Sequence, residues 1–475
     1  MFRVPATAIL IFGILGAAPS AQNQPAPTQS TPPAHLLLKG NLVTPDGVIR
    51  GGWLDIANAH ILHIEREKPD VPGALVLETS DLVFPGFIDL HNHPSFNIFP
   101  RWTPPHKFPN RYAWRDWAIY KQQLESKARA LQADPANFCD IDEYAEVKAL
   151  IGGTTSIIGL GSNHMPGEAS TSPDCMRGLV RNLDHYTGFY GKALDHERIA
   201  NSIGILPRDM DANTAALRKQ QIADGSLDLL AIHIAEGLPT DAESAQELDM
   251  LEAHGLLTAH TALIHSVGLS PSQLARVHRA GASIVWSPRS NFELYGQTAN
   301  VAAAFREGVT ISLAPDWSPT GSDNMWEEIQ YAYQVNARDL NVLFTGHQLL
   351  EMASSVPARV AGIDDKVGSI APGMLADFFL IKPPAELDTN LFDAMLTQNI
   401  NAIDLVVIDG VPVYGDPAML KSLNIATEPL RLCGTEKALN SAALPNGAFA
   451  AVEARLSAKM KALGTELGPL DSCPK

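Results

Sequence analysis

The sequence predicts an α/β protein in which a (β/α)8 TIM barrel interrupts a small β domain. In the middle of the chain, short runs rich in Val, Ile and Leu alternate with helical patterns, which is typical of βα units in a parallel sheet. No glycine-rich dinucleotide loop follows the first strand of this series, so a closed barrel is favoured over an open doubly wound sheet. Polar residues also fall at several different strand ends, as the mouth of a barrel requires.

Residues 1–21 have the order of a secretory signal peptide. Arg3 supplies a positive charge, residues 6–18 are almost unbroken apolar sequence, and small residues surround a cleavage point after Ser20 or Ala21. The apolar run is short for a membrane anchor, although a retained membrane helix is the alternative. Residues 22–34, rich in Pro, Gln, Ser and Thr, are typical of a disordered linker. We therefore expect a periplasmic or secreted protein without a stable membrane anchor.

The composition is that of a soluble globular protein, with 45% hydrophobic and 18% charged residues among 475. The formal net charge of −17 argues against binding to nucleic acid or anionic membranes, because both would repel the chain. A small-molecule partner is expected, and homo-oligomerisation is left open.

Four cysteines in an exported chain favour disulfides, with Cys139–Cys175 and Cys433–Cys473 as the sequence-local pairs and buried free thiols as the alternative.

The small β domain is predicted from residues 35–84 and 364–415, on either side of a barrel over residues 85–363. Its strand-like runs, separated by turns, are 36–38, 52–56, 60–64, 376–381 and 402–411. The C-terminal extension, residues 416–475, contains a predicted helix over 447–464.

Three βα units of the barrel are marked by helix start and stop signals. Asp140 with Glu143 resembles a capping box at the start of a helix over 140–151, and a strand over 154–158 follows. The second unit has a helix that Ser270-Pro271 opens and Gly281 closes, then a strand over 283–286. The third has a helix over 300–307 that ends at Gly308, then a strand over 309–313.

The first barrel strand ends in His91-Asn-His93. Residues i and i+2 of a strand point to the same side, so both imidazoles can face the barrel mouth and share one ion. A buried strand over 227–234 delivers His233, with Glu236 three residues later as a carboxylate for proton transfer. Taken singly, each could be an ordinary core histidine or a solvated glutamate.

Two more strand ends carry polar residues. A strand over 258–266 delivers His265, which could polarise the scissile group, and Asp316 directly follows another strand. A structural histidine and a helix cap are the alternatives for these two taken alone. Chance agreement at all four strand ends is improbable, so we predict one divalent metal ion in a hydrolytic site.

These residues resemble the amidohydrolase superfamily, in its mononuclear-metal branch of deaminases and triazine hydrolases. The matching segments are Pro85 to His93, His233 to Glu236, His265, Ser287 to Asn291 with Leu294 and Gly296, Leu313 to Asp316, and Gly368 to Asp377. The resemblance implies a distorted (β/α)8 barrel with a split β-sandwich domain. It also implies Zn2+, or alternatively Fe2+, bound by His91, His93, His233 and Asp316, with proton transfer by Glu236, His265 and Asp316. The candidate fourth strand, residues 201–206, lacks the bridging lysine of the two-metal branches.

The expected reaction is hydrolysis of a non-peptide C–N bond, with deamination of a heterocyclic amidine as the leading interpretation. The alternatives are opening of a cyclic amide, as in imidazolonepropionase-like relatives, cleavage of an acyclic amide, and a non-catalytic binding protein.

Residues 96–138 are crowded with aromatic side chains. They could form a lid that stacks on a planar ring, or a satellite hydrophobic cluster or dimer contact. Trp102, Arg289 and Asn291 are the predicted substrate-binding residues.

Overall fold

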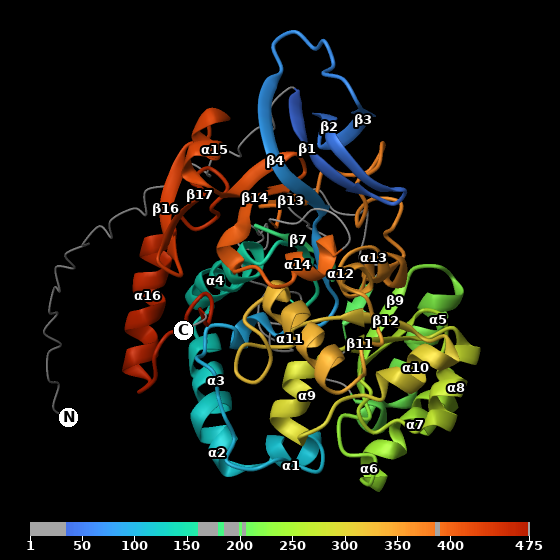
Figure 1. Ribbon diagram of the computed structural model, residues 1–475. Helices are drawn as coiled ribbons and strands as arrows, with labels where there is room; N and C mark the ends of the chain where they lie inside the picture. Colours follow the sequence, from blue (N-terminus) through green and yellow to red (C-terminus); the bar gives the residue numbers. More distant parts are fainter. Residues whose placement is uncertain (1–34, 160–178, 185–198, 202–205, 385–389, 474–475) are drawn as a thin grey trace, which may run out of the picture.

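The computed structural model describes residues 35–159, 179–184, 199–201, 206–384 and 390–473. It has two β-rich parts, and helices surround the lower part in Figure 1. The chain passes directly from a strand of the upper part that ends at Pro85 to a strand of the lower part that begins at Phe87. The predicted signal peptide and linker lie outside the described residues. Within the described ranges, no helix combines the length and the apolar character needed to cross a membrane.

The strands of the small β domain are hydrogen-bonded into one nine-stranded sheet with the order β16-β17-β15-β14-β13-β4-β1-β2-β3. Its strands are β1 Leu36–Thr44, β2 Gly47–Ala57, β3 His60–Glu65, β4 Leu75–Pro85, β13 Phe378–Ile381, β14 Ile403–Ile408, β15 Val411–Gly415, β16 Thr427–Leu432 and β17 Thr435–Asn440. Antiparallel pairing of β13 with β4 joins the two predicted halves. The predicted C-terminal extension therefore adds two strands to this sheet, which its sequence pattern did not indicate.

Eight parallel strands form the lower part, in one sheet of three and one of five. They are β5 Phe87–Asp89, β6 Thr154–Ile157, β7 Arg181–Asn182, β8 Ile199–Asn201, β9 Leu229–Ile234, β10 Thr261–His265, β11 Ser283–Trp286 and β12 Thr310–Leu313. An isolated parallel bridge between Asn92 and Asp316 links the residues that follow the first and last of these strands. The eight strands and their helices have the TIM-barrel type of architecture that the sequence predicts. Residues 202–205 of the candidate fourth strand lie outside the described ranges.

Sixteen α-helices occur in the described ranges. They are α1 Arg111–Arg115, α2 Ala118–Tyr120, α3 Ser126–Gln132, α4 Phe138–Ile151, α5 Ala212–Ala223, α6 Ala242–Ala245, α7 Glu247–Ala253, α8 Pro271–Ala280, α9 Pro288–Tyr295, α10 Val301–Glu307, α11 Met325–Arg338, α12 Gly346–Glu351, α13 Ser355–Ala361, α14 Leu391–Met395, α15 Pro417–Ser422 and α16 Phe449–Ala462. Helix α8 begins after Ser270 and ends at Gly281, as predicted, and Gly281 has the left-handed conformation with φ 73°. The structure adds a capping box between Ser270 and Gln273 at its start.

The start predicted for α4 is wrong. The helix begins at Phe138, so Asp140 and Glu143 lie inside it and form no capping box. Asp140 instead pairs with Arg455 of α16 at 2.6 Å, and Glu143 accepts a hydrogen bond from the backbone N of Asn446. These carboxylates therefore fasten the C-terminal part of the chain to the barrel, a long-range role that local sequence cannot distinguish from capping.

A disulfide joins Cys433, directly after β16, to Cys473 near the chain end, as one of the sequence-local pairings predicts. Cys139 is also disulfide-bonded, whereas Cys175 lies outside the described residues. The C-terminal tail packs on the barrel as well, because the Tyr144 hydroxyl donates to the carbonyl oxygen of Gly468 at 2.6 Å.

Candidate active site

The two histidines of the first strand are held at the barrel mouth by a tight turn after β5. The Asp89 carboxylate accepts the backbone N–H of His91 at 3.0 Å and the side-chain amide of Asn92 at 2.6 Å. The backbone N of His93 donates to the carbonyl oxygen of Asp316 at 3.0 Å, and the N of Asp316 donates to that of His91 at 3.2 Å. The first and last strands thus meet at this point.

Four ligand atoms converge there, from residues distant in the sequence. His91 Nε2 lies 3.3 Å from His93 Nε2, 3.2 Å from His233 Nε2 and 3.3 Å from Asp316 Oδ1. His93 Nε2 is also 3.3 Å from Asp316 Oδ1. Ligands about 2.05 Å from a tetrahedral ion stand roughly 3.3 Å apart. We call these four side chains the ligand cluster; its spacing is that of the coordination shell of a single ion.

The chemistry of the ligand cluster also fits a cation. His91, His233 and Asp316 are buried. Burial lowers the pKa of His91 and of His233 well below the ordinary value, which leaves neutral imidazoles able to donate lone pairs. Lone pairs that converge in a buried space repel one another unless a positive charge lies between them. The donors therefore support a divalent metal ion, held by three nitrogens and one carboxylate oxygen.

Residues at the start of α9 orient two of the ligands. Ser287 Oγ is hydrogen-bonded to His91 Nδ1 at 3.1 Å, and Ser290 Oγ donates to Asp316 Oδ2 at 2.5 Å. Such contacts fix the orientation of a ligating side chain. Asp316 also has a left-handed backbone with φ 69°, as does His265 with φ 68°. This uncommon conformation at both positions is consistent with a site that requires particular side-chain directions.

Glu236 lies beside the ligand cluster and is held from two sides. The Tyr295 hydroxyl donates to Glu236 Oε1 at 2.7 Å, and the Arg111 guanidinium lies 3.3 Å from Glu236 Oε2. Trp114 Nε1 in turn donates to the Tyr295 hydroxyl at 2.8 Å. The Glu236 carboxylate thus has a fixed position from which it can accept or release a proton.

His265 lies between Glu236 and Asp316. Its Nε2 is 3.7 Å from Glu236 Oε1 and 3.9 Å from Asp316 Oδ2. Its other ring nitrogen, Nδ1, is hydrogen-bonded to Asn291 Oδ1 at 2.9 Å. Because the amide oxygen of Asn291 can only accept, it places the proton on Nδ1, and a neutral ring then presents Nε2 as an acceptor.

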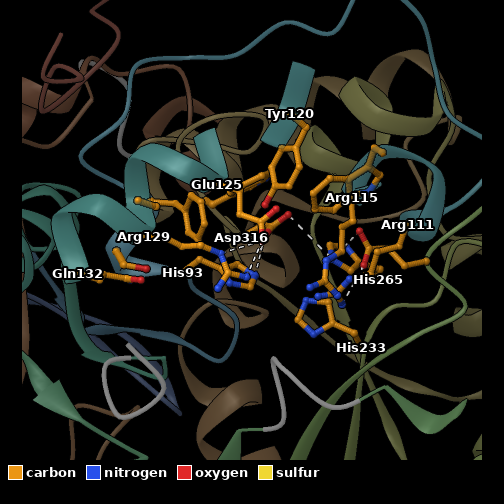
Figure 2. A pocket seen from close by; sticks show the side chains of 16 residues that line it. His93, Arg111, Arg115, Tyr120, Glu125, Arg129, Gln132, His233, His265 and Asp316 are labelled. Carbon is orange, nitrogen blue, oxygen red and sulfur yellow. Dashed lines mark hydrogen bonds and ion pairs between the residues drawn. The ribbon is translucent and has the colours of Figure 1, made fainter. Parts of the chain in front are cut away.

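A cavity of about 240 Å³ opens over these residues. Its floor is formed by His93, His233, Glu236, His265, Asp316 and Trp317. Its outer wall comes from residues 94–132, which we call the covering segment and which contributes Phe96, Arg111, Trp114, Arg115, Tyr120 and Arg129 (Figure 2). The aromatic segment predicted to cover the barrel mouth therefore lies on the cavity.

The structure does not bring the three predicted substrate-binding residues to the cavity wall. Arg289 pairs with Glu327 at 2.6 Å and lines a different surface pocket, because α9 directs it away from the mouth. Trp102 donates to Gln123 at 2.9 Å and packs behind Tyr120. Asn291 is fully buried and contacts His265 instead.

Sequence reasoning missed several residues of this site: Arg111, Arg115, Ser290, Tyr295 and Trp317. Trp317 directly follows Asp316, and Ser290 lies within the Ser287–Asn291 segment, so proximity to recognised motifs was an available signal. The arginines and Tyr295 reach the site from short helices that carry no regular pattern. Only the fold places them there.

Residues 225–413 match the family model described as the Amidohydrolase family. A 5-methylthioadenosine/S-adenosylhomocysteine deaminase of Desulforudis audaxviator is 26% identical over 70% of this chain and 81% of its own length. A 5'-deoxyadenosine deaminase of Methanothermobacter thermautotrophicus is 24% identical over 73% of this chain and 84% of its own.

Solved structures share the fold at low sequence identity. An adenosine deaminase from Xanthomonas campestris with bound zinc superposes with a TM-score of 0.66, at 16% identity, over 92% of this chain and all of that one. An atrazine chlorohydrolase from Arthrobacter aurescens complexed with zinc gives a TM-score of 0.63 at 16% identity, over 80% of this chain and 95% of that one.

Proposed function

The chain belongs to the amidohydrolase superfamily, in its deaminase-like branch, and we propose that it removes an amino group from a small heterocyclic amidine by hydrolysis. It is a hydrolase that acts on carbon–nitrogen bonds other than peptide bonds. The observation that carries the proposal is the ligand cluster, with three imidazole nitrogens and one carboxylate oxygen, next to a fixed Glu236.

We propose zinc as the ion. His91, His93, His233 and Asp316 would hold it, a nitrogen-rich set with a tetrahedral spacing that suits Zn2+. Two of the structural relatives contain zinc, which supports the same choice. When bound, the ion supplies Lewis acidity, which makes water nucleophilic near neutral pH. Elemental analysis of the purified protein distinguishes zinc from the alternative, Fe2+.

The protein's own residues then handle the protons. Glu236 accepts a proton from the attacking water and delivers it to the nitrogen of the substrate, while Tyr295 and Arg111 keep its carboxylate in place. His265 Nε2 lies within 4 Å of both Glu236 and Asp316, where it accepts a hydrogen bond from the attacking water and orients it. The covering segment limits the access of bulk water.

Deamination is favoured over opening of a cyclic amide by the sequence relatives, since both of those named above are deaminases. Release of ammonia from a panel of purines, pyrimidines and triazines tests this choice. A new carboxylate without ammonia would instead favour the imidazolonepropionase-like alternative.

The decisive variant is Glu236→Gln. The amide keeps the size of the side chain and its hydrogen bond from Tyr295 but cannot carry the proton, so kcat should fall by about 10²–10⁴-fold. The metal content should stay at that of the wild type. Glu252→Gln, at an exposed ion pair with Arg276, is the matched control. Wild-type turnover in the first variant would remove Glu236 from the mechanism.

We also propose that the protein is exported to the periplasm or secreted. The signal-like order of residues 1–21 supports this, as does the Cys433–Cys473 disulfide, because disulfides persist mainly in oxidising compartments. N-terminal sequencing of the mature protein from fractionated cells tests the proposal. Export predicts a new N-terminus near Gln22, whereas an intact Met1 in the cytoplasmic fraction would contradict it.

A further inference from the structure

One arginine that lines the cavity is exposed and forms no ion pair with a described residue. Helix α1 places Arg111 and Arg115 one turn apart, on the same side. Arg111 is ion-paired with Glu236, whereas no ion pair or hydrogen bond joins the Arg115 guanidinium to any residue within the described ranges. The Arg115 side chain is exposed to solvent and stays cationic at neutral pH.

The other two arginines that line the cavity are each in an ion pair. Arg129 pairs with Glu125 at 2.6 Å, and Arg111 pairs with Glu236. Asp316 belongs to the ligand cluster, where its negative charge opposes that of an ion. Arg115 therefore adds uncompensated positive charge to the cavity, in a chain with a net charge of −17.

An aromatic surface lines the cavity near Arg115. The rings of Trp114 and Trp317 are 5.6 Å apart, Phe96 lies 5.3 Å from Trp317, and Tyr120 lies 4.9 Å from Trp114. This surface suits the flat face of a conjugated ring. Figure 2 shows Arg115 and Tyr120 on one side of the space above His265 and Asp316.

Helix geometry gives the length of the ligand. Arg111 marks the reacting end, since it contacts Glu236, and four residues of helix advance about 6 Å to Arg115. We use this spacing as a guide to the distance between Glu236 and a group bound by Arg115. This distance suits a substituent on the ring or on a short side chain.

We propose that Arg115 is a specificity-determining residue that binds an anionic oxygen group, a carboxylate or a phosphate, on a compact planar substrate. The inference deepens the proposed function and rests on it for the identity of the reacting end. A guanidinium with no internal partner can form a two-pronged contact with such a group without breaking an existing ion pair. The aromatic surface holds the ring, and Arg115 selects the substituent.

Binding of simple probes tests the proposal without any turnover. Benzoate and phenyl phosphate carry the ring and the anion, and benzamide is the neutral match for benzoate. By calorimetry on the metal-loaded protein, we expect at least one anionic probe to bind about ten-fold more tightly than benzamide. Arg115→Met should lose this preference. Arg115→Lys should retain part of it, since lysine keeps the positive charge but lacks the planar guanidinium that donates two parallel hydrogen bonds.

The controls separate this site from the ligand cluster. Arg338→Met, at an exposed pair with Asp339, should keep the wild-type preference. Equal affinities for all three probes in the wild type would overturn the proposal. So would an anion preference that survives Arg115→Met but disappears when the metal is removed, because the anion would then be bound at the ligand cluster. If Arg115→Met loses the preference and no C–N substrate is hydrolysed, the anion site stands and the proposed reaction fails.

Discussion

The ligand cluster and the covering segment face the same cavity but are built differently. Each proposed ligand lies in or just after a short parallel strand. Most of the cluster is buried and held by short internal contacts such as Ser290 to Asp316. The covering segment consists of short helices with partly exposed ion pairs such as Arg129 to Glu125. The difference indicates that the barrel fixes the reaction, whereas the covering segment determines which molecule reaches it.

The largest effect should come from the ligand cluster itself. His233→Ala removes one of the three proposed nitrogen ligands, so the bound metal should fall well below one ion per chain and activity by at least about 10³-fold. Elemental analysis and an ammonia assay measure the two effects. His278→Ala, at an exposed position on α8, should change neither. Full metal content in His233→Ala would mean that this imidazole is not a ligand.

An intermediate effect is expected where the two regions meet. Tyr295→Phe keeps the ring but removes one hydrogen bond to the Glu236 carboxylate, which should lower kcat/KM about ten-fold, or ~1.4 kcal/mol. Metal content should not change. Tyr333→Phe, on α11 and away from the cavity, is the control. A loss confined to metal binding would show that Tyr295 supports the ligand cluster rather than Glu236.

The smallest effect should come from the exposed part of the covering segment. Arg129 is 58% exposed in its pair with Glu125, so Arg129→Met should change the free energy of unfolding by less than about 0.5 kcal/mol. Urea denaturation measures this value. A destabilisation of several kcal/mol would show that the covering segment is as firmly built as the barrel, and the contrast between the two regions would disappear.

The sequence predicted the barrel and the ligand cluster because both leave local marks. His91, His93 and Asp316 follow apolar strands and His233 lies near the end of another, and the resemblance of these segments to a known family indicated the ligand set. The partners Arg111 and Tyr295 leave no such mark, since each acts through a tertiary contact with Glu236. Arg289 was assigned to the cavity by its nearness to Asn291 in sequence, but the direction in which α9 points its side chains decides the matter. Strands β16 and β17, which pair with each other, were missed; the pairing of β17 with β15 that adds them to the sheet is a tertiary contact.

The backbone contact between His91 and Asp316 has a consequence for the order in which the molecule is made. Ribosomes deliver the first two imidazoles early and the carboxylate only after several further βα units. A nascent chain that ends between them therefore carries only some of the metal ligands. Such a partial site should bind the ion weakly, so little metal should bind before the chain is complete. Ion uptake should accordingly follow completion of the last barrel strand, so that metal content serves as a measure of how many molecules have finished folding.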